Sequence, residues 1–184
     1  MHPVQTILQT ILQRDYDEAA RLSRQHLQQQ PADPTVLALR SFALGNLLLG
    51  ELPVARRAEL EREHLHHASQ VLDHLSPEQF SDDETIAQIQ HAALADAFAT
   101  RARWRYDSAG TARDLDEALA LAIAGEHTCG SSRSLLEVQA LCLLRLGREV
   151  EARAIIAQVT TDPLASTAAF LDDVRRATAA GPPA

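Results

Sequence analysis

The sequence predicts an all-α fold of antiparallel helix hairpins, with about eight or nine helices and a C-terminal capping helix. Hydrophobic residues make up 46% of the 184-residue chain but aromatic residues only 4%, so Leu and Ala must fill most of the interior. Such small aliphatic side chains let helices pack closely. A short signature ending in alanine also recurs along the chain, which indicates a repeated unit.

The recurring signature predicts where the second helix of each hairpin begins. It reads DYDEA at 15–19, ELPVA at 51–55, DLDEA at 114–118 and GREVEA at 147–152. Its closing alanines, Ala19, Ala55, Ala118 and Ala152, are separated by 36, 63 and 34 residues. Acidic residues suit the first turn of a helix because they complement the helix dipole. Each alanine is expected to face the preceding helix, where a small side chain permits close approach.

The first hairpin is predicted from residues 2–13 and the signature helix that follows them. Tyr16 is expected to fill the elbow, and Leu22 and Leu27 to extend the buried stripe. Pro31 then ends the second helix, because proline lacks a backbone N–H and disfavours helix in the residue before it.

The second hairpin is predicted over residues 36–69, with Gly50 at the turn. Its second helix is expected to be long, from 53 to 75, because apolar residues keep a helical spacing throughout. The residues expected to form its buried seam are Leu65, Ala68, Leu72 and Leu75. The segment 76–83 then breaks this helix.

The rest of the chain predicts five more helices. A long helix at 84–106 carries an inward stripe that reaches Trp104, and a loop follows at 107–114. After a helix that starts with the third signature, residues 133–163 form the clearest complete hairpin after the first. A last helix then caps the apolar face of this hairpin. Its inward residues are expected to be Leu164, Ala168, Leu171 and Val174, and residues 181–184 a short disordered tail.

The segment DYDEAARLSRQHLQQQP at 15–31 resembles the second helix and terminator of a tetratricopeptide (TPR) repeat. Residues 36–69 and 133–163 look like further repeats, so the resemblance covers about two thirds of the chain. It implies that the first helices of successive hairpins line a concave groove. The groove residues it implies are Leu37, Arg40, Leu44, Leu47 and Leu48, then Ser134, Glu137, Leu141, Leu144 and Arg145. The other interpretation is that these leucines are core residues.

Length and charge limit the classes of protein to consider. The chain suits one domain, predicted over residues 1–180. A net charge of −8 argues against a nucleic-acid partner. No apolar run resembles a signal peptide or a membrane span, so we expect a cytoplasmic protein with no membrane partner. Cys129 and Cys142 are expected to be reduced, because a helix from 132 would separate them by about 15 Å.

Motifs of catalysis or cofactor binding are not found in the sequence. The glycines of GNLLLGEL at 45–52 have P-loop spacing but lack the Lys and Ser/Thr that follow. We therefore predict no enzyme activity, no cofactor and no metal. A histidine cluster at 64–74 offers one alternative, because His64 and His67 lie one helical turn apart and could hold a metal with Glu63. The other interpretations are a solvated helix face or a pH-sensitive surface.

The segment RARWRY at 101–106 combines arginine with aromatic residues. Arg101 and Arg105 with Trp104 could bind an acidic peptide or a nucleic-acid strand. The structural interpretation is that Trp104 belongs to the core and that the arginines complement the helix C-terminus.

Together these patterns predict a non-enzymatic module that binds another protein or peptide segment in a helical groove. Arg40 and Arg145 at the groove edges would suit acidic groups on the partner. Such a module would be an adaptor, a chaperone or an immunity-type protein. The alternative is a self-associating structural subunit, such as a homodimer formed through the seam of the 53–75 helix.

Overall fold

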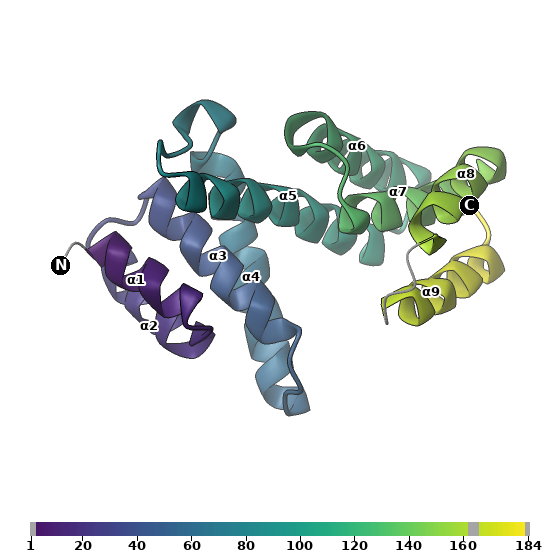
Figure 1. The fold of residues 1–184 in the computed structure, drawn as a ribbon. Helices are drawn as coiled ribbons and strands as arrows, with labels where there is room; N and C mark the ends of the chain where they lie inside the picture. Colours follow the sequence, from purple (N-terminus) through teal and green to yellow (C-terminus); the bar gives the residue numbers. More distant parts are fainter. Residues whose placement is uncertain (1–2, 162–165, 183–184) are drawn as a thin grey trace. The chain divides into compact units, whose positions relative to one another are not determined.

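The computed structural model describes residues 3–161 and 166–182, and within these ranges the chain is all-α and has no strand (Figure 1). Nine α-helices pack in sequence along this described chain. They are α1 Pro3–Leu12, α2 Tyr16–Leu27, α3 Pro34–Leu48, α4 Val54–His74, α5 Glu84–Asp107, α6 Ala112–Cys129, α7 Arg133–Arg145, α8 Glu149–Thr160 and α9 Ser166–Ala180. A short 3-10 helix, Pro77–Gln79, interrupts the chain between α4 and α5. The predicted all-α class is confirmed.

The helices form two compact units, Met1–Ala97 and Phe98–Ala184, where the sequence predicted one domain. The boundary falls inside α5, whose first part belongs to unit 1 and whose last part belongs to unit 2. Each unit has its own hydrophobic core and is described by itself.

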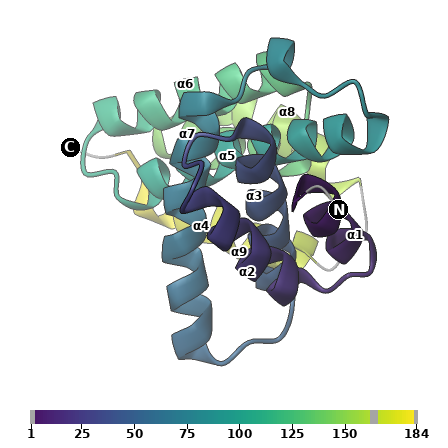
Figure 2. The same cartoon turned by 90° about the vertical axis from the view of Figure 1, so that its left-hand side faces the viewer.

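Unit 1 is built around α3, which packs on α1, α2 and α4 (Figure 2). Because α3 has neighbours on several sides, most of its residues from Val36 to Leu44 are buried. Side-chain caps set where the helices begin. Asp15 accepts a hydrogen bond from the backbone N–H of Glu18 at the start of α2, and Asp33 caps α3 in the same way.

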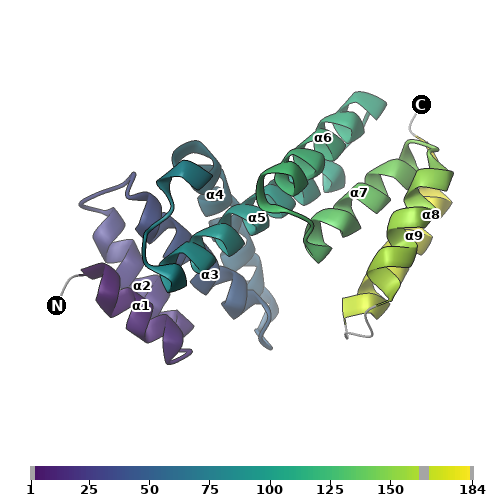
Figure 3. The ribbon, with the colours of Figure 1, turned by 45° about the horizontal axis from the view of Figure 1, so that its top comes forward.

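Unit 2 is built around α7, which packs on α6, α8 and α9 (Figure 3). Thr111 and Asp114 form a capping box that starts α6 at Ala112, so the loop predicted at 107–114 is shorter than expected. Gly125 permits a close approach inside this unit, because a Cβ there would lie 2.6 Å from Phe98 Cβ.

Three of the four signature alanines occupy the predicted position. Ala19, Ala118 and Ala152 are fully buried in the cores of their units. Ala55 is exposed in the first turn of α4, which is a correction to the prediction. The reason is that α4 first enters the core at Leu60, more than one turn after Ala55. The ELPVA segment therefore resembles the other signatures in sequence but not in environment.

The last helix covers the unit 2 core with residues that differ from those predicted. Phe170 and Ala177 are buried, with Val174 packed against the same core. Ala168 is exposed, which corrects its predicted inward position, and Leu171 is half-buried. The predicted inward residue Leu164 lies outside the described residues, as do residues 183 and 184 of the predicted tail.

Candidate functional site

Residues of α1, α3 and α5, with Arg14 and Tyr16 from the turn and start of α2, line an apolar depression of about 330 Å³, called here the α1–α3–α5 groove. Its lining residues are Ile11, Leu12, Arg14, Tyr16, Phe42, Thr85, Gln88 and Ile89. Ile11 and Ile89 are buried in its floor, whereas Leu12 is 63% exposed. The groove thus combines an apolar floor with accessible apolar surface at its edge.

Arg14 gives the groove a positive charge at its edge. Its backbone occupies the left-handed region, with φ 61°, the only such non-glycine residue among those described. This conformation lets Arg14 N–H and Asp15 N–H donate to Ile11 O and Thr10 O, which closes the α1–α2 elbow. The exposed Arg14 side chain forms no ion pair with the described residues. Its charge is therefore free to meet an acidic group.

The groove residues predicted in α3 belong to the unit 1 core instead. Leu37, Arg40 and Leu44 are at most 1% exposed, and Leu47 and Leu48 are half-buried against the same core. This corrects the predicted groove position of the first three residues, because α2 and α4 pack over the faces that carry them. Phe42 is the α3 residue that reaches the groove.

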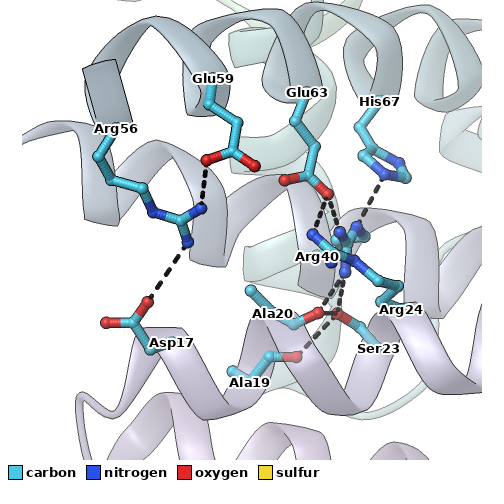
Figure 4. Close-up of polar contacts among 10 residues, drawn as sticks. All are labelled: Asp17, Ala19, Ala20, Ser23, Arg24, Arg40, Arg56, Glu59, Glu63 and His67. Atoms are coloured by element: carbon cyan, nitrogen blue, oxygen red, sulfur yellow. Dashed lines mark hydrogen bonds and ion pairs between the residues drawn. The ribbon is translucent and has the colours of Figure 1, made fainter. Parts of the chain in front are cut away.

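Arg40 is held by a buried polar network between α2, α3 and α4 (Figure 4). Its Nε donates to His67 Nε2 at 2.7 Å, its Nη2 donates to Glu63 Oε1, and its Nη1 donates to Ala20 O. Arg24 on α2 donates to the same Glu63 oxygen at 2.7 Å. Arg40 is thus a structural cation, and its predicted role at a groove edge is corrected for that reason.

The network shifts the pKa values of its members. Burial, together with the neighbouring Arg40 charge, lowers the pKa of His67 to about 4. Burial alone would raise the pKa of Glu63, but hydrogen bonds and charge from Arg24 and Arg40 outweigh it and leave that pKa lowered. At neutral pH His67 is therefore uncharged and Glu63 ionised.

Two of the four α4 histidines are buried, which corrects the interpretation of this cluster as a solvated face, whereas His66 and His74 are exposed. His64 and His67 are buried, and His64 Nε2 hydrogen-bonds to Asp96 Oδ2 at 2.6 Å. The inward stripe of α4 is turned toward them and away from Leu65 and Leu72, which are only half-buried. In the described ranges no group of three His, Cys, Asp or Glu side chains is placed to hold a metal ion.

The predicted site residues of α5 lie in unit 2 with Trp104 on the surface. Trp104 is 45% exposed, so its predicted core position is wrong. Arg101 stacks over the Trp104 ring at 5.3 Å. Arg105 is engaged in an ion pair with Glu117 of α6, with 2.9 Å between Nη1 and Oε2. Tyr106 takes the inward position in place of Trp104, because the α6 and α7 residues of the core pack there.

Most of the predicted groove residues of α7 are also buried or paired with other residues of unit 2. Leu141 is fully buried, which corrects its predicted groove position. Glu137 pairs with Arg133 at 2.9 Å. Arg145 is half-buried with its guanidinium 5.4 Å from the Tyr106 ring and 3.4 Å from the carbonyl oxygens of Tyr106 and Ala109. Of the other two, Ser134 is exposed and Leu144 packs against the unit 2 core.

The two cysteines are both free and buried in unit 2, as predicted. Burial raises the pKa of the Cys129 thiol, and it raises the pKa of Cys142 to about 12. Neither environment favours the thiolate that a nucleophilic cysteine needs.

Most of the α1–α3–α5 groove is not predictable from the sequence. Leu12, Arg14, Thr85 and Gln88 come from segments far apart in the chain, and no single helix pattern links them. One signal was present, because Arg14 stands at the place in the α1–α2 elbow that Gly147 holds in the α7–α8 elbow.

None of the described helices combines the length and the apolar character needed to cross a membrane. Comparison of the chain with protein-family models, with curated proteins and with solved structures found no match.

Proposed function

We propose that the chain is a TPR-like module of helix hairpins that binds a segment of a partner polypeptide in the α1–α3–α5 groove. The observation that carries this proposal is the groove itself, lined by side chains of α1, α3 and α5 together with Arg14 and Tyr16. In such a module the partner is bound without chemistry, as in an adaptor, a chaperone or an immunity-type protein.

The lining of the groove indicates the chemistry of the bound segment. Phe42, Ile11 and Ile89 offer apolar contact to one or two aliphatic or aromatic side chains. Arg14 at the edge adds a charge-assisted hydrogen bond to a neighbouring carboxylate. The expected partner segment therefore carries an apolar residue beside Asp or Glu.

The alternative, self-association, required the seam of α4 to be exposed, and this seam is largely buried within unit 1. The predicted seam residues Ala68 and Leu75 are buried within unit 1, and Leu65 and Leu72 are half-buried there. A partner copy would have to use another face of the chain.

Selection of short peptides displayed on phage, with the whole chain as bait, tests the proposal. Enriched peptides should share an apolar residue next to an acidic one. Leu12→Glu should weaken their binding by about tenfold or more, which is about 1.4 kcal/mol. The new carboxylate at the groove edge would repel the acidic residue of the peptide.

Leu49→Glu is the matched control, because Leu49 is 85% exposed in the same unit but does not line the groove. Its affinity for the selected peptides should equal that of the parent chain. Peptides that bind the Leu12→Glu and Leu49→Glu variants equally well would show that the groove is not the binding site.

A further inference from the structure

A second pocket of unit 1, of about 210 Å³, lies beside the Arg40 network and is independent of the α1–α3–α5 groove. It is lined by Arg24, Leu27, Gln28, Pro31, Arg40, His66, His67 and Gln70. These residues come from α2 and the turn after it, from α3 and from α4. None of them lines the groove, so the two sites can be tested separately.

His67 lines this pocket and carries a hydrogen-bond donor that no described residue accepts. Its Nε2 must act as an acceptor, because the Arg40 guanidinium that bonds to it at 2.7 Å can only donate. The neutral imidazole therefore carries its proton on Nδ1. This atom is buried, in a side chain only 9% exposed, and has no hydrogen-bond partner among the described residues. A buried donor without an acceptor is unfavourable, so a ligand that supplies an acceptor would be stabilised.

The charges around the pocket sum to a single positive charge. Arg24 and Arg40 both bond to one carboxylate, that of Glu63, and His67 is neutral. Arg24 is 58% exposed, so its guanidinium can reach a second anion. One further negative charge would balance the cluster, which favours a monoanion over a dianion such as phosphate.

Gln70 supplies the remaining polar contact. Its Oε1 is buried and has no hydrogen-bond partner in the described chain. A half-turn of the side-chain amide would present the NH₂ group at the same place and so offer a second donor. The pocket is smaller than the range of about 300–1,000 Å³ that is usual for ligand sites, which suits one small acid or one acidic side chain.

We propose that this pocket binds a carboxylate, with one oxygen accepting from His67 Nδ1–H and the charge balanced by Arg24. The apolar stem of the acid would lie against Leu27 and Pro31. The carboxylate comes from a small free acid or from an Asp or Glu side chain of a peptide.

Titration of the whole chain with sodium acetate at constant ionic strength tests this proposal, followed by NMR of the His67 ring nitrogens. Acetate should shift the Nδ1 signal in a saturable way, whereas sodium chloride should not. His67→Gln should weaken acetate binding by about tenfold or more, because it removes the Nδ1–H donor but keeps an acceptor for Arg40. For the variants, binding is followed through the ring signals of His66, which also lines the pocket.

His64→Gln is the matched control, since it makes the same change one turn earlier on α4 outside the pocket. It should bind acetate as the parent chain does. Arg24→Gln serves if His67→Gln does not fold, because Arg24 is exposed and its loss should weaken binding as well. A shift that does not saturate, or acetate affinities of His67→Gln and Arg24→Gln that both equal that of the parent chain, would overturn the proposal.

A blocked peptide with one Glu, compared with its Gln analogue, identifies the source of the carboxylate. Tighter binding of the Glu peptide than of acetate assigns the pocket to a polypeptide partner. Binding of acetate but not of the peptide assigns it to a small acid. Leu12→Glu should change neither result, so failure of this proposal is distinct from failure of the groove proposal.

Discussion

The α1–α2 hairpin of unit 1 and the α7–α8 hairpin of unit 2 turn at elbows with the same hydrogen bonds. In α1–α2, N–H groups of Arg14 and Asp15 donate to Ile11 O and Thr10 O at 2.8 and 3.0 Å. In α7–α8, the N–H groups of Gly147 and Arg148 donate to Leu144 O and Leu143 O at 3.0 and 2.9 Å. Both patterns close the end of the first helix through one left-handed residue.

The residue in the left-handed position is where the two elbows differ. Gly147, with φ 74°, adopts this conformation without steric cost, whereas Arg14, with φ 61°, has a Cβ that opposes it. The cost for a non-glycine residue is about 1 kcal/mol or more. Unit 1 therefore carries strain at the one elbow whose side chain lines a groove. Strain of this kind often marks functional positions, and here it supports a role for the Arg14 side chain.

The two units also differ in how deeply they bury an arginine. Unit 1 encloses Arg40 completely and satisfies it with His67, Glu63 and a backbone carbonyl. Unit 2 leaves Arg145 at the edge of its core, over the Tyr106 ring. The buried Arg40 charge is therefore stabilised only by its protein partners. At Arg145, water can replace part of the stabilising environment.

The largest expected effect comes from removing these two arginines. Arg40→Met should lower the free energy of unfolding by about 3 kcal/mol, because it leaves Glu63 and His67 without their buried partner. Arg145→Met should cost about 1 kcal/mol, the usual value for hydrogen bonds to backbone carbonyls. Urea unfolding of the two variants and the parent chain measures both values. Equal losses would show that the two units do not differ in this respect.

Enlarging the signature alanines gives the next largest effect. Ala19→Leu and Ala152→Leu should each cost about 1–3 kcal/mol, because both side chains lie buried at equivalent elbows. Ala55→Leu is the matched control on an exposed position and should change stability by less than about 0.5 kcal/mol. Thermal unfolding of the three variants ranks them. A large loss in Ala55→Leu would contradict the exposed position of this residue.

Helix positions were predictable from the sequence because their signals are local. The long helices predicted at 53–75 and 84–106 match α4 and α5 to within one residue at each end. Proline before α4 and the acidic loop before α5 mark these boundaries without information from the rest of the chain. The same reasoning placed Ala19 and Ala152 correctly, since the elbow signature lies within a few residues of each.

Helix faces were harder to predict because they depend on distant partners. The sequence of α3 has apolar residues on every face of the helix, so it does not indicate which face meets a groove. Arg40 was expected at a groove edge, because an arginine is seldom fully buried unless it is paired. It is buried because Glu63 and His67, from the next helix, meet it in the interior. The groove was missed for a similar reason, since it unites residues of α1, α3 and α5.

The smallest expected effect tests the elbow comparison directly. Exchanging the two residues should change stability in opposite directions, because each variant moves a side chain into or out of the left-handed conformation. Arg14→Gly should raise the free energy of unfolding by about 1 kcal/mol, and Gly147→Arg should lower it by a similar amount. Urea unfolding of both variants measures the difference.

The same Arg14→Gly variant connects the strain to the groove. If the Arg14 side chain contacts an acidic group on the partner, the variant should become more stable and yet bind the selected peptides more weakly. Gly147→Arg should bind them as the parent chain does, because Gly147 belongs to the other unit. A more stable Arg14→Gly chain with unchanged peptide affinity would show that the strain at Arg14 is unrelated to peptide binding. The left-handed arginine would then be a feature of the elbow alone, with no part in binding.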